Sequence, residues 1–195
     1  MALRLVDAPT SLLVSLSEAK AQLRVTSSAE DAVITRYLKA AQAEAERLTQ
    51  RRYAAQTLEW ILDGFCDDLV LPVAGAGDAS EMTVDFVKYV DLQGVTQTLD
   101  PTAYWVSPAG PSLRIKKPWT VFWPILGDGA ERLVIRFSIA DPDPTAHQDV
   151  AQAIVLLVAH WYANREAVVG VDARAVPVAL PLGVTDLLPP PWNAS

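Results

Sequence analysis

The sequence is poor in the residues that most often carry catalysis or metal binding. It contains one cysteine, Cys66, and two histidines, His147 and His160. A single cysteine cannot form an internal disulfide, so the fold does not depend on an oxidising compartment. No HExxH motif, paired cysteines or His/Cys cluster is present, and the two histidines point in different directions from one predicted helix. We therefore predict no metal site, no cofactor and no catalytic residue.

Positive charge and long apolar runs are also scarce. Lysine and arginine number 16 against 23 aspartate and glutamate residues, a net charge of −7. Because DNA-binding surfaces work through basic residues that release counterions, this balance argues against a protein that grips DNA. The apolar run 153–159 is far shorter than the roughly 20 residues of a membrane helix. Asp7 and Pro9 interrupt the apolar residues at the N-terminus, which makes a poor signal peptide, so we expect a cytoplasmic protein without a membrane segment.

Residues 144–168 have the pattern of a central helix. Asp143 is placed as its N-cap and Pro144 as its first helical residue, and Thr145 and Gln148 have the spacing of a capping box. Most faces of this segment are apolar, so the predicted helix must be covered on several sides. One stripe at helical spacing contains Val150, Ile154, Leu157, Val158 and Trp161.

Two further capping-box spacings predict two helices within residues 15–53. Ser15 and Glu18 mark the start of a short helix that ends near residue 25. Ser27 and Glu30 mark the start of a longer helix over about residues 29–52. The apolar stripe of this second helix is narrow and rich in alanine, so another element can approach it closely.

Between residues 56 and 140 the hydrophobic period changes from helical to two, which predicts strands. Short strands that end in Gly, Pro and Asp indicate a small antiparallel sheet or sandwich. The expected class is α+β: a single domain, residues 1–195, with a three-helix core of two N-terminal helices and one long C-terminal helix, a β insertion at 56–140, and an extended C-terminal arm. The predicted strands are 56–62, 68–72, 82–91, 95–99, 104–107, 113–116 and 132–139.

The arm, residues 171–195, is rich in proline and shows strict alternation. Apolar residues alternate with proline, alanine or glycine between Val176 and Val184, which predicts an extended segment with one apolar edge. Two interpretations are open: the segment folds back on its own core, or it docks on another chain, as extended peptides do in grooves or at sheet edges. Its apolar residues are Val176, Val178, Leu180, Leu182, Val184, Leu187, Leu188 and Trp192.

Bulky aromatic residues gather in a loop-like stretch at residues 116–124. Trp119, Phe122 and Trp123 lie there beside two lysines. Surface aromatic residues mark interfaces more often than catalytic sites, so this stretch is a possible interface loop. A loop that folds onto its own sheet would use the same residues.

One set of residues could support acid–base chemistry. Asp141, Asp143 and His147 are close in sequence, and paired carboxylates can act as acid and base in a small hydrolase. The predicted N-cap role, however, explains Asp143 without any catalysis.

Taken together, residues 16–192 resemble the head-tail connector (adaptor) proteins of tailed bacteriophages and gene transfer agents, in the branch whose helical core carries a β insertion. The resemblance rests on LSEAKAQLRV at 16–25, the helix that follows from Glu30 and Asp31, and IVLLVAHWYANRE at 154–166. The most distinctive part is the end of the last motif, HWYANRE. The sequence departs from the family in LLPPPW at 187–192, because the family has a basic residue after the aromatic one.

The resemblance implies a structural role. Such proteins form a ring, usually of twelve copies, beneath the portal of a filled capsid, and the tail or its stopper docks on that ring. DNA passes through the ring without sequence-specific binding, and the protein resides in the virion neck after assembly in the host cytoplasm. On this basis we expect the apolar arm to bind the portal, and Glu44 and Glu46 to face a neighbour or the lumen. A tail-completion protein, a minor capsid protein and a small hydrolase are the alternatives.

Overall fold

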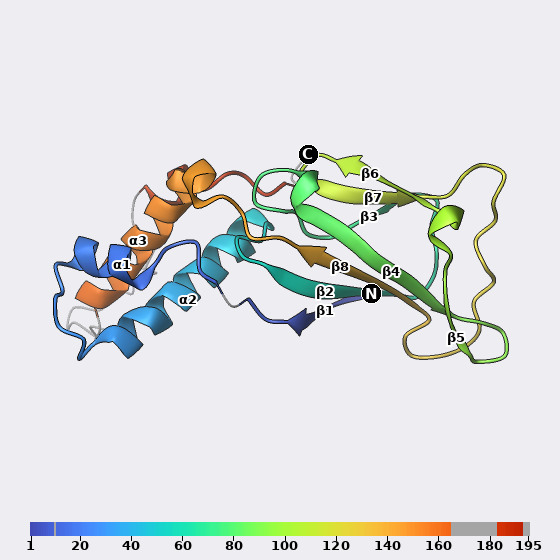
Figure 1. Cartoon of the computed structure of the whole chain (residues 1–195), viewed down its shortest axis with the longest axis horizontal. Coiled ribbons are helices and arrows are strands. Elements are labelled where there is room, and N and C mark those ends of the chain that lie inside the picture. The colour runs from blue at the N-terminus through green and yellow to red at the C-terminus, as the bar shows by residue number, and fades with distance from the viewer. Residues whose placement is uncertain (10, 165–182, 193–195) are drawn as a thin grey trace, which may run out of the picture. The chain divides into compact units, whose positions relative to one another are not determined.

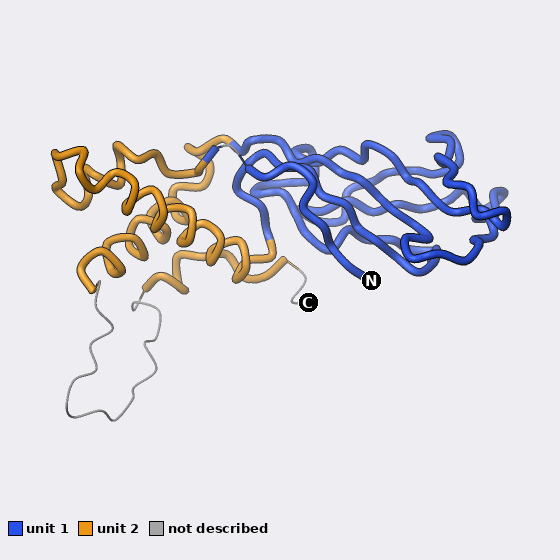
Figure 2. Tube along the Cα trace, turned by 90° about the horizontal axis from the view of Figure 1, so that it is seen from below, with its two compact units in different colours: residues 1–11, 51–142 blue, residues 12–50, 143–195 orange. Residues whose placement is uncertain are grey.

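The computed structural model describes residues 1–9, 11–164 and 183–192, and it combines helices with antiparallel sheets, so the chain is α+β (Figure 1). The chain forms two compact units (Figure 2). Residues 1–11 and 51–142 form the first, which we call the β unit, and residues 12–50 and 143–195 form the second, which we call the helical unit.

The β unit contains two antiparallel sheets. One has five strands in the order β1-β2-β8-β4-β5, and the other has three in the order β3-β7-β6. Every strand predicted between residues 56 and 140 forms, with bounds that differ by a few residues. The strands are β1 Ala2–Asp7, β2 Gln56–Leu62, β3 Leu69–Val70, β4 Met82–Val90, β5 Thr96–Thr98, β6 Trp105–Ala109, β7 Ser112–Lys116 and β8 Leu133–Ile139.

Alternation places the core of the β unit on one face of the larger sheet. On β2, Leu58 and Trp60 are 3% and 5% exposed, as their shared face predicts. On β8, Ile135 and Phe137 are fully buried, whereas Arg136 between them faces outward and pairs with Glu59. Sequence periodicity therefore identifies which side chains of these strands form the core.

Strand β1 was not among the predicted strands. It runs antiparallel to β2, with Leu3 opposite Trp60 and Leu5 opposite Leu58. The alternation of Leu3, Arg4 and Leu5 is a weak signal over six residues, and the partner strand lies more than 50 residues away in sequence. The β unit thus takes its first strand from the segment that precedes the first helix.

The helical unit begins with α1, residues Leu16–Leu23, at the predicted capping box. The backbone N–H of Glu18 donates to Ser15 Oγ at 3.2 Å, and the backbone N–H of Ser15 donates to Glu18 Oε2 at 2.8 Å. Each side chain satisfies a backbone donor that the helix leaves unpaired, so this prediction is confirmed.

The other two predicted capping boxes do not form. Helix α2, residues Asp31–Thr49, has Glu30 as N-cap without a side-chain cap bond, and the Glu30 carboxylate instead accepts a hydrogen bond from the hydroxyl of Tyr162. The Thr145 hydroxyl donates to Asp143 at 2.8 Å rather than capping with Gln148. In both places a carboxylate takes a charge-assisted hydrogen bond from a hydroxyl group, and the predicted reciprocal pair does not form.

The third helix, α3, spans Gln148–Ala163 and contacts both α1 and α2. A 3-10 turn, Pro144–His147, precedes it, and the predicted N-cap Asp143 caps that turn rather than the α-helix itself. The predicted end at residue 168 lies outside the described residues. Four residues of the predicted stripe are at most 1% exposed, while Trp161 is half-buried and packs at 6.4 Å from the ring of Tyr37. The buried four are Val150, Ile154, Leu157 and Val158.

The described end of the chain corrects the prediction of an extended arm. Residues Val184–Leu187 form a short helix, α4, after Gly183 with φ +98°, and α4 contacts α3. Val184 is fully buried, and the backbone N–H of Trp192 donates to the carbonyl of Thr49 at 3.3 Å. Residues 184–192 thus fold back on the helical unit, because the apolar surface of α3 must be covered. The arm residues Val176, Val178, Leu180 and Leu182 lie outside the described residues.

Candidate functional site

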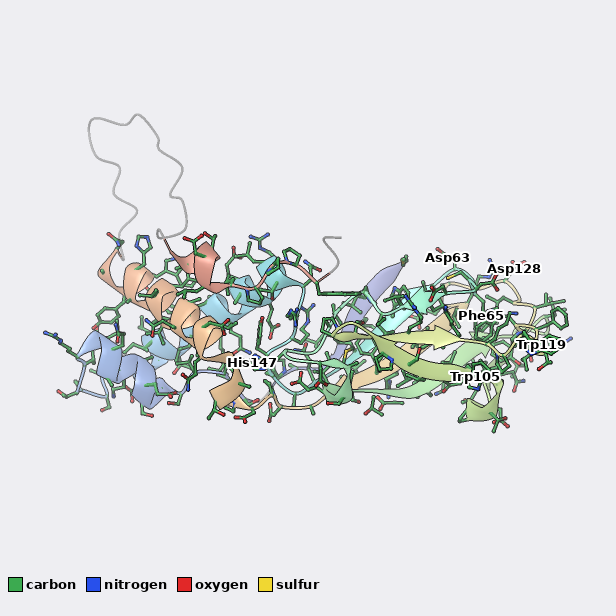
Figure 3. The ribbon with its side chains drawn as sticks, turned by 90° about the horizontal axis from the view of Figure 1, so that it is seen from above. Asp63, Phe65, Trp105, Trp119, Asp128 and His147 are labelled. Atoms are coloured by element: carbon green, nitrogen blue, oxygen red, sulfur yellow. The ribbon has the colours of Figure 1, made fainter. Side chains whose placement is uncertain are left out.

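Large apolar side chains lie exposed on the β unit. Trp119 and Phe122 are 88% and 87% exposed, and Ile125 in the same loop is 73% exposed. Trp105, at the start of β6, is 60% exposed, and Figure 3 shows Trp105 and Trp119 toward the same end of the β unit. Because side chains of this size are normally buried, their exposure marks this end, which we call the aromatic end, as a candidate interaction surface.

The loop that carries the aromatic end is anchored from within. The ring of Trp123 stacks on Phe65 with centroids 4.5 Å apart and planes 6° apart, and Trp123 Nε1 donates to the carbonyl of Cys66 at 3.1 Å. The Gly127 N–H donates to the Val90 carbonyl at 2.9 Å. Of the three predicted interface residues, Trp119 and Phe122 are therefore available to a partner, whereas Trp123 holds the loop in place.

The two carboxylates of the hydrolase alternative, Asp141 and Asp143, have structural roles. Asp141, in the β unit, accepts hydrogen bonds from Ser11 Oγ at 2.5 Å and from the Ala55 N–H at 2.8 Å, and these hold the pKa of Asp141 below its usual value. Asp143 accepts from the hydroxyl and N–H of Thr145, which likewise lowers its pKa. Both carboxylates are exposed, engaged and poorly basic, so neither has the environment of a general base that works near neutral pH.

The helical unit has a groove of about 680 Å³ between α1 and the start of α3. Its lining is mainly aliphatic and amide side chains, among them Val14, Gln22, Gln152 and Val155. Its one carboxylate, Glu18, is already used in the capping box. In the part of the chain that the structure describes, no group of three or more His, Cys, Asp or Glu residues could hold a metal ion, and no helix is long and apolar enough to span a membrane.

The two acidic residues expected at a neighbour or lumen face lie on α2 and are half-buried. Glu44 Oε1 lies 2.7 Å from Arg47 Nη2, one turn along the helix, which lowers the pKa of Glu44. The Glu46 carboxylate accepts a hydrogen bond from Gln42 Nε2 at 3.4 Å. The charge of Glu44 is thus partly neutralised within its own helix.

An ionic cluster occupies a second groove, of about 400 Å³, on the outer face of the five-stranded sheet. The Glu59 side chain is 6% exposed and lies between two arginines, at 2.5 Å from Arg4 Nη2 and 2.6 Å from Arg136 Nη2. Arg4 also reaches Glu131 at 2.6 Å. This network joins β1, β2 and β8, the three strands at one side of the sheet.

Acid is expected to weaken the β unit through Glu59. Burial raises the pKa of Glu59, but the hydrogen bonds and charges of Arg4 and Arg136 outweigh burial and hold the pKa below its ordinary value. Such a carboxylate stabilises the fold above the unfolded-state pKa of about 4.3, and this stabilisation is lost as pH falls through the lower folded-state pKa. We expect urea midpoints to fall below about pH 4.3, and Glu59→Gln to flatten this dependence. Glu131→Gln, which changes an exposed partner of Arg4, is the control and should retain most of the dependence of the urea midpoint on pH. The assignment would be contradicted if the urea midpoints of wild type and Glu59→Gln fell equally steeply with pH.

Comparison with known proteins agrees with a structural role. Residues 13–79 match the family of phage gp6-like head-tail connector proteins. The matched range contains α1, α2 and the first two strands that follow them. None of the curated proteins matches the sequence.

The whole fold is similar to that of solved neck proteins. A chain in the neck of an empty gene transfer agent particle, solved with C6 symmetry, has a TM-score of 0.74 and 26% identity, over 96% of this chain and 93% of that one. A chain from the virion of a native gene transfer agent particle gives the same values. A chain from the native neck with C12 symmetry has a TM-score of 0.70 and 24% identity, over 96% and 94% of the two chains.

These matches are to structural proteins of a particle neck and not to an enzyme family. They also extend far beyond the helical motifs, because 96% of the chain is covered. By sequence over residues 13–79 and by fold over nearly its whole length, this chain is similar to head-tail connector and gene transfer agent neck proteins, in agreement with the resemblance that its sequence motifs indicated.

Proposed function

We propose that this chain is a structural head-tail connector that forms a ring beneath the portal and joins the DNA-filled head to the tail. The observation that carries the proposal is the similarity of fold to a gene transfer agent neck protein over 96% of the chain, together with the connector family match at residues 13–79. Rings are supported by the C6 and C12 symmetry of those necks, and we propose twelve copies in the particle. The chain would reach the virion neck after assembly in the host cytoplasm.

The charge of the chain suits a ring that DNA passes through. A net charge of −7 repels the phosphate backbone, so DNA can move through the lumen without sequence-specific binding. We assign Glu44 and Glu46 of α2 to the lumen or to a neighbouring copy. In this proposal the chain, residues 1–195, acts as one connector subunit whose ring core is built from α1, α2 and α3.

Two surfaces are proposed for the partners at either end of the neck. The apolar arm would contact the portal through residues 176–182, with Leu187, Leu188 and Trp192 near its base. The aromatic end, with Trp119 and Phe122 exposed, would receive the tail or its stopper. Val184 is fully buried in the helical unit, so it supports the arm rather than contacting the portal.

Electron microscopy of lysates from a strain with this gene disrupted tests the proposal. DNA-filled heads that lie apart from finished tails are the expected result, because head completion and tail assembly would proceed without the piece that joins them. Supplying the intact gene from a plasmid is the control and should restore joined particles. Normal tailed particles in the disrupted strain would overturn the connector role, and empty or unfinished heads would point to a minor capsid role instead.

A further inference from the structure

We propose that strand β1 is an intersubunit contact: its open edge takes the opposite edge of the same sheet, β5, from a second copy of this chain. The inference rests on the proposed ring and names the surfaces that would close it. It starts from the position of β1, which is the first strand of the five-stranded sheet and pairs only with β2 among the described strands.

The edge of β1 is long and regular. All six residues, Ala2–Asp7, are exposed, and the pairing with β2 is continuous from Ala2 to Leu5, with a register shift only between Leu5 and Asp7. The outer edge of such a strand offers a row of backbone N–H and C=O groups that have no strand beside them. A second strand can therefore add there by main-chain hydrogen bonds.

The apolar core face of the sheet continues onto β1 but loses its cover there. Leu3 and Leu5 lie opposite Trp60 and Leu58, which belong to the buried core. Trp60 and Leu58 are 5% and 3% exposed, whereas Leu3 and Leu5 are 38% and 50% exposed. The strand thus presents two leucines that an added strand and its side chains would cover.

Strand β1 is also held in place before any partner arrives. On the outer face, Arg4 is fixed by Glu59 and by Glu131, and the N-terminal amino group lies 3.4 Å from Asp63. A partner that adds to a fixed strand does not have to order that strand first, which reduces the entropic cost of association.

Both edges of the three-stranded sheet are protected against strand addition. The edge strand β6 contains Pro108, which has no N–H to donate, and β3 has two residues only. Strand β1 contains no proline and is six residues long. An unprotected apolar edge invites aggregation in a free protein, so an edge of this kind is expected to be covered in the working assembly.

The opposite edge of the same sheet supplies the second surface. Among the described strands β5 pairs only with β4, and residues 92–98 are all exposed. The turn that leads into β5 is ordered by Asp91, whose carboxylate accepts hydrogen bonds from the N–H of Val95 and from Gln97 Nε2. These hydrogen bonds brace the turn beside the β5 edge.

Two different edges on one subunit suit a ring. A contact that joins unlike surfaces is heterologous, and repeated rotation of such a contact closes a cyclic assembly. All neighbours in the sheet are antiparallel, so β1 and β5 run in the same direction. A small rotation between neighbouring copies preserves that direction, so β1 of one copy would lie parallel to β5 of the next.

Cysteine cross-linking in assembled particles tests this contact. Two double variants, Leu3→Cys with Gln97→Cys and Leu5→Cys with Gln97→Cys, are made in a Cys66→Ser background and treated with a short bifunctional maleimide. Within one copy the two edges are four strand spacings apart, about 19 Å, so the short linker joins different copies only. We expect a ladder of dimers and larger multiples on denaturing gels from at least one double variant, and none from the single-cysteine variants.

The outcomes separate this inference from the proposed function. Particles that contain the chain in their neck but give no ladder from either double variant would overturn the β1–β5 contact and leave the connector role intact. A dimer from Leu5→Cys alone would also overturn it, because that product requires β1 to face β1. If purified necks did not contain the chain, that result would instead contradict the proposed connector function.

A charge substitution gives a second measurement that does not depend on cross-linking geometry. Leu5→Asp is expected to abolish rings while the purified chain keeps its circular dichroism and melting temperature. Val106→Asp, at a β6 residue of similar exposure, is the matched control and should still form rings. Normal rings from Leu5→Asp would contradict the proposal.

Discussion

Replacing Val176, Val178, Leu180 and Leu182 together by serine is expected to abolish portal binding and to leave the chain folded. These four residues form one apolar edge in the sequence, and covering a side chain of this size contributes about 1.5 to 3 kcal/mol. Loss of four such contacts lowers affinity by more than about 100-fold even if each is only partly covered. Binding to the purified portal protein of the same particle, followed by interferometry, measures the effect.

The control for this variant is set by the packing of the neighbouring residues. Val184 continues the same alternation but is fully buried in the helical unit, so Val184→Ser should lower the melting temperature instead. Truncation after Asp172 would not separate the two effects, because it removes Val184 and Trp192 along with the arm. Portal affinity of the quadruple variant within a few-fold of wild type would show that the arm is not the portal contact.

Gly127→Ala is expected to destabilise the β unit by about 3 kcal/mol or more. A Cβ at this position would lie 1.9 Å from the carbonyl oxygen of Asp91, which is backbone and cannot turn away as a side chain could. The loop would have to move and lose the hydrogen bond from the Gly127 N–H to the Val90 carbonyl, and Arg132 Nε would lose its acceptor at Gly127. Urea unfolding followed by tryptophan fluorescence measures the change.

Gly64→Ala is the matched control, because a Cβ there meets no atom within 4 Å. That variant is expected to unfold within about 0.5 kcal/mol of wild type. Gly127 ends the loop that carries Trp119 and Phe122, so Gly127→Ala should also weaken the binding of any partner that docks on the aromatic end. A stability of Gly127→Ala equal to that of Gly64→Ala would show that the loop accommodates the methyl group without strain.

Neighbouring aromatic residues show how far local sequence could define the candidate surface. Trp119, Phe122 and Trp123 occur within five residues, and nothing in their spacing separates them. The structure buries part of Trp123 because Phe65, more than 50 residues earlier, provides a flat ring to stack on. Trp119 and Phe122 have no comparable cover, so they remain exposed. Which aromatic residue is available to a partner is decided by contacts that are distant in sequence.

The sequence by itself determined the features that depend on short-range physics. The capping box at Ser15, the Asp143 cap before Pro144, the apolar stripe of α3 and the period-two strands between residues 56 and 140 all follow from backbone geometry and side-chain spacing. Its connector motifs also indicated the family, because they preserve a packing pattern of neighbouring residues.

Where a segment had more than one available partner, only the tertiary structure decided which partner it contacts. Glu30 bonds Tyr162 rather than Ser27, β1 pairs with β2 across the sequence of two helices, and residues 184–192 cover α3 instead of extending. In each case a local preference worth about 1 kcal/mol yields to burial or to a charge-assisted bond that only the folded chain brings within reach. Such contacts join residues that are distant in sequence, so the local spacing of residues along the chain does not predict them.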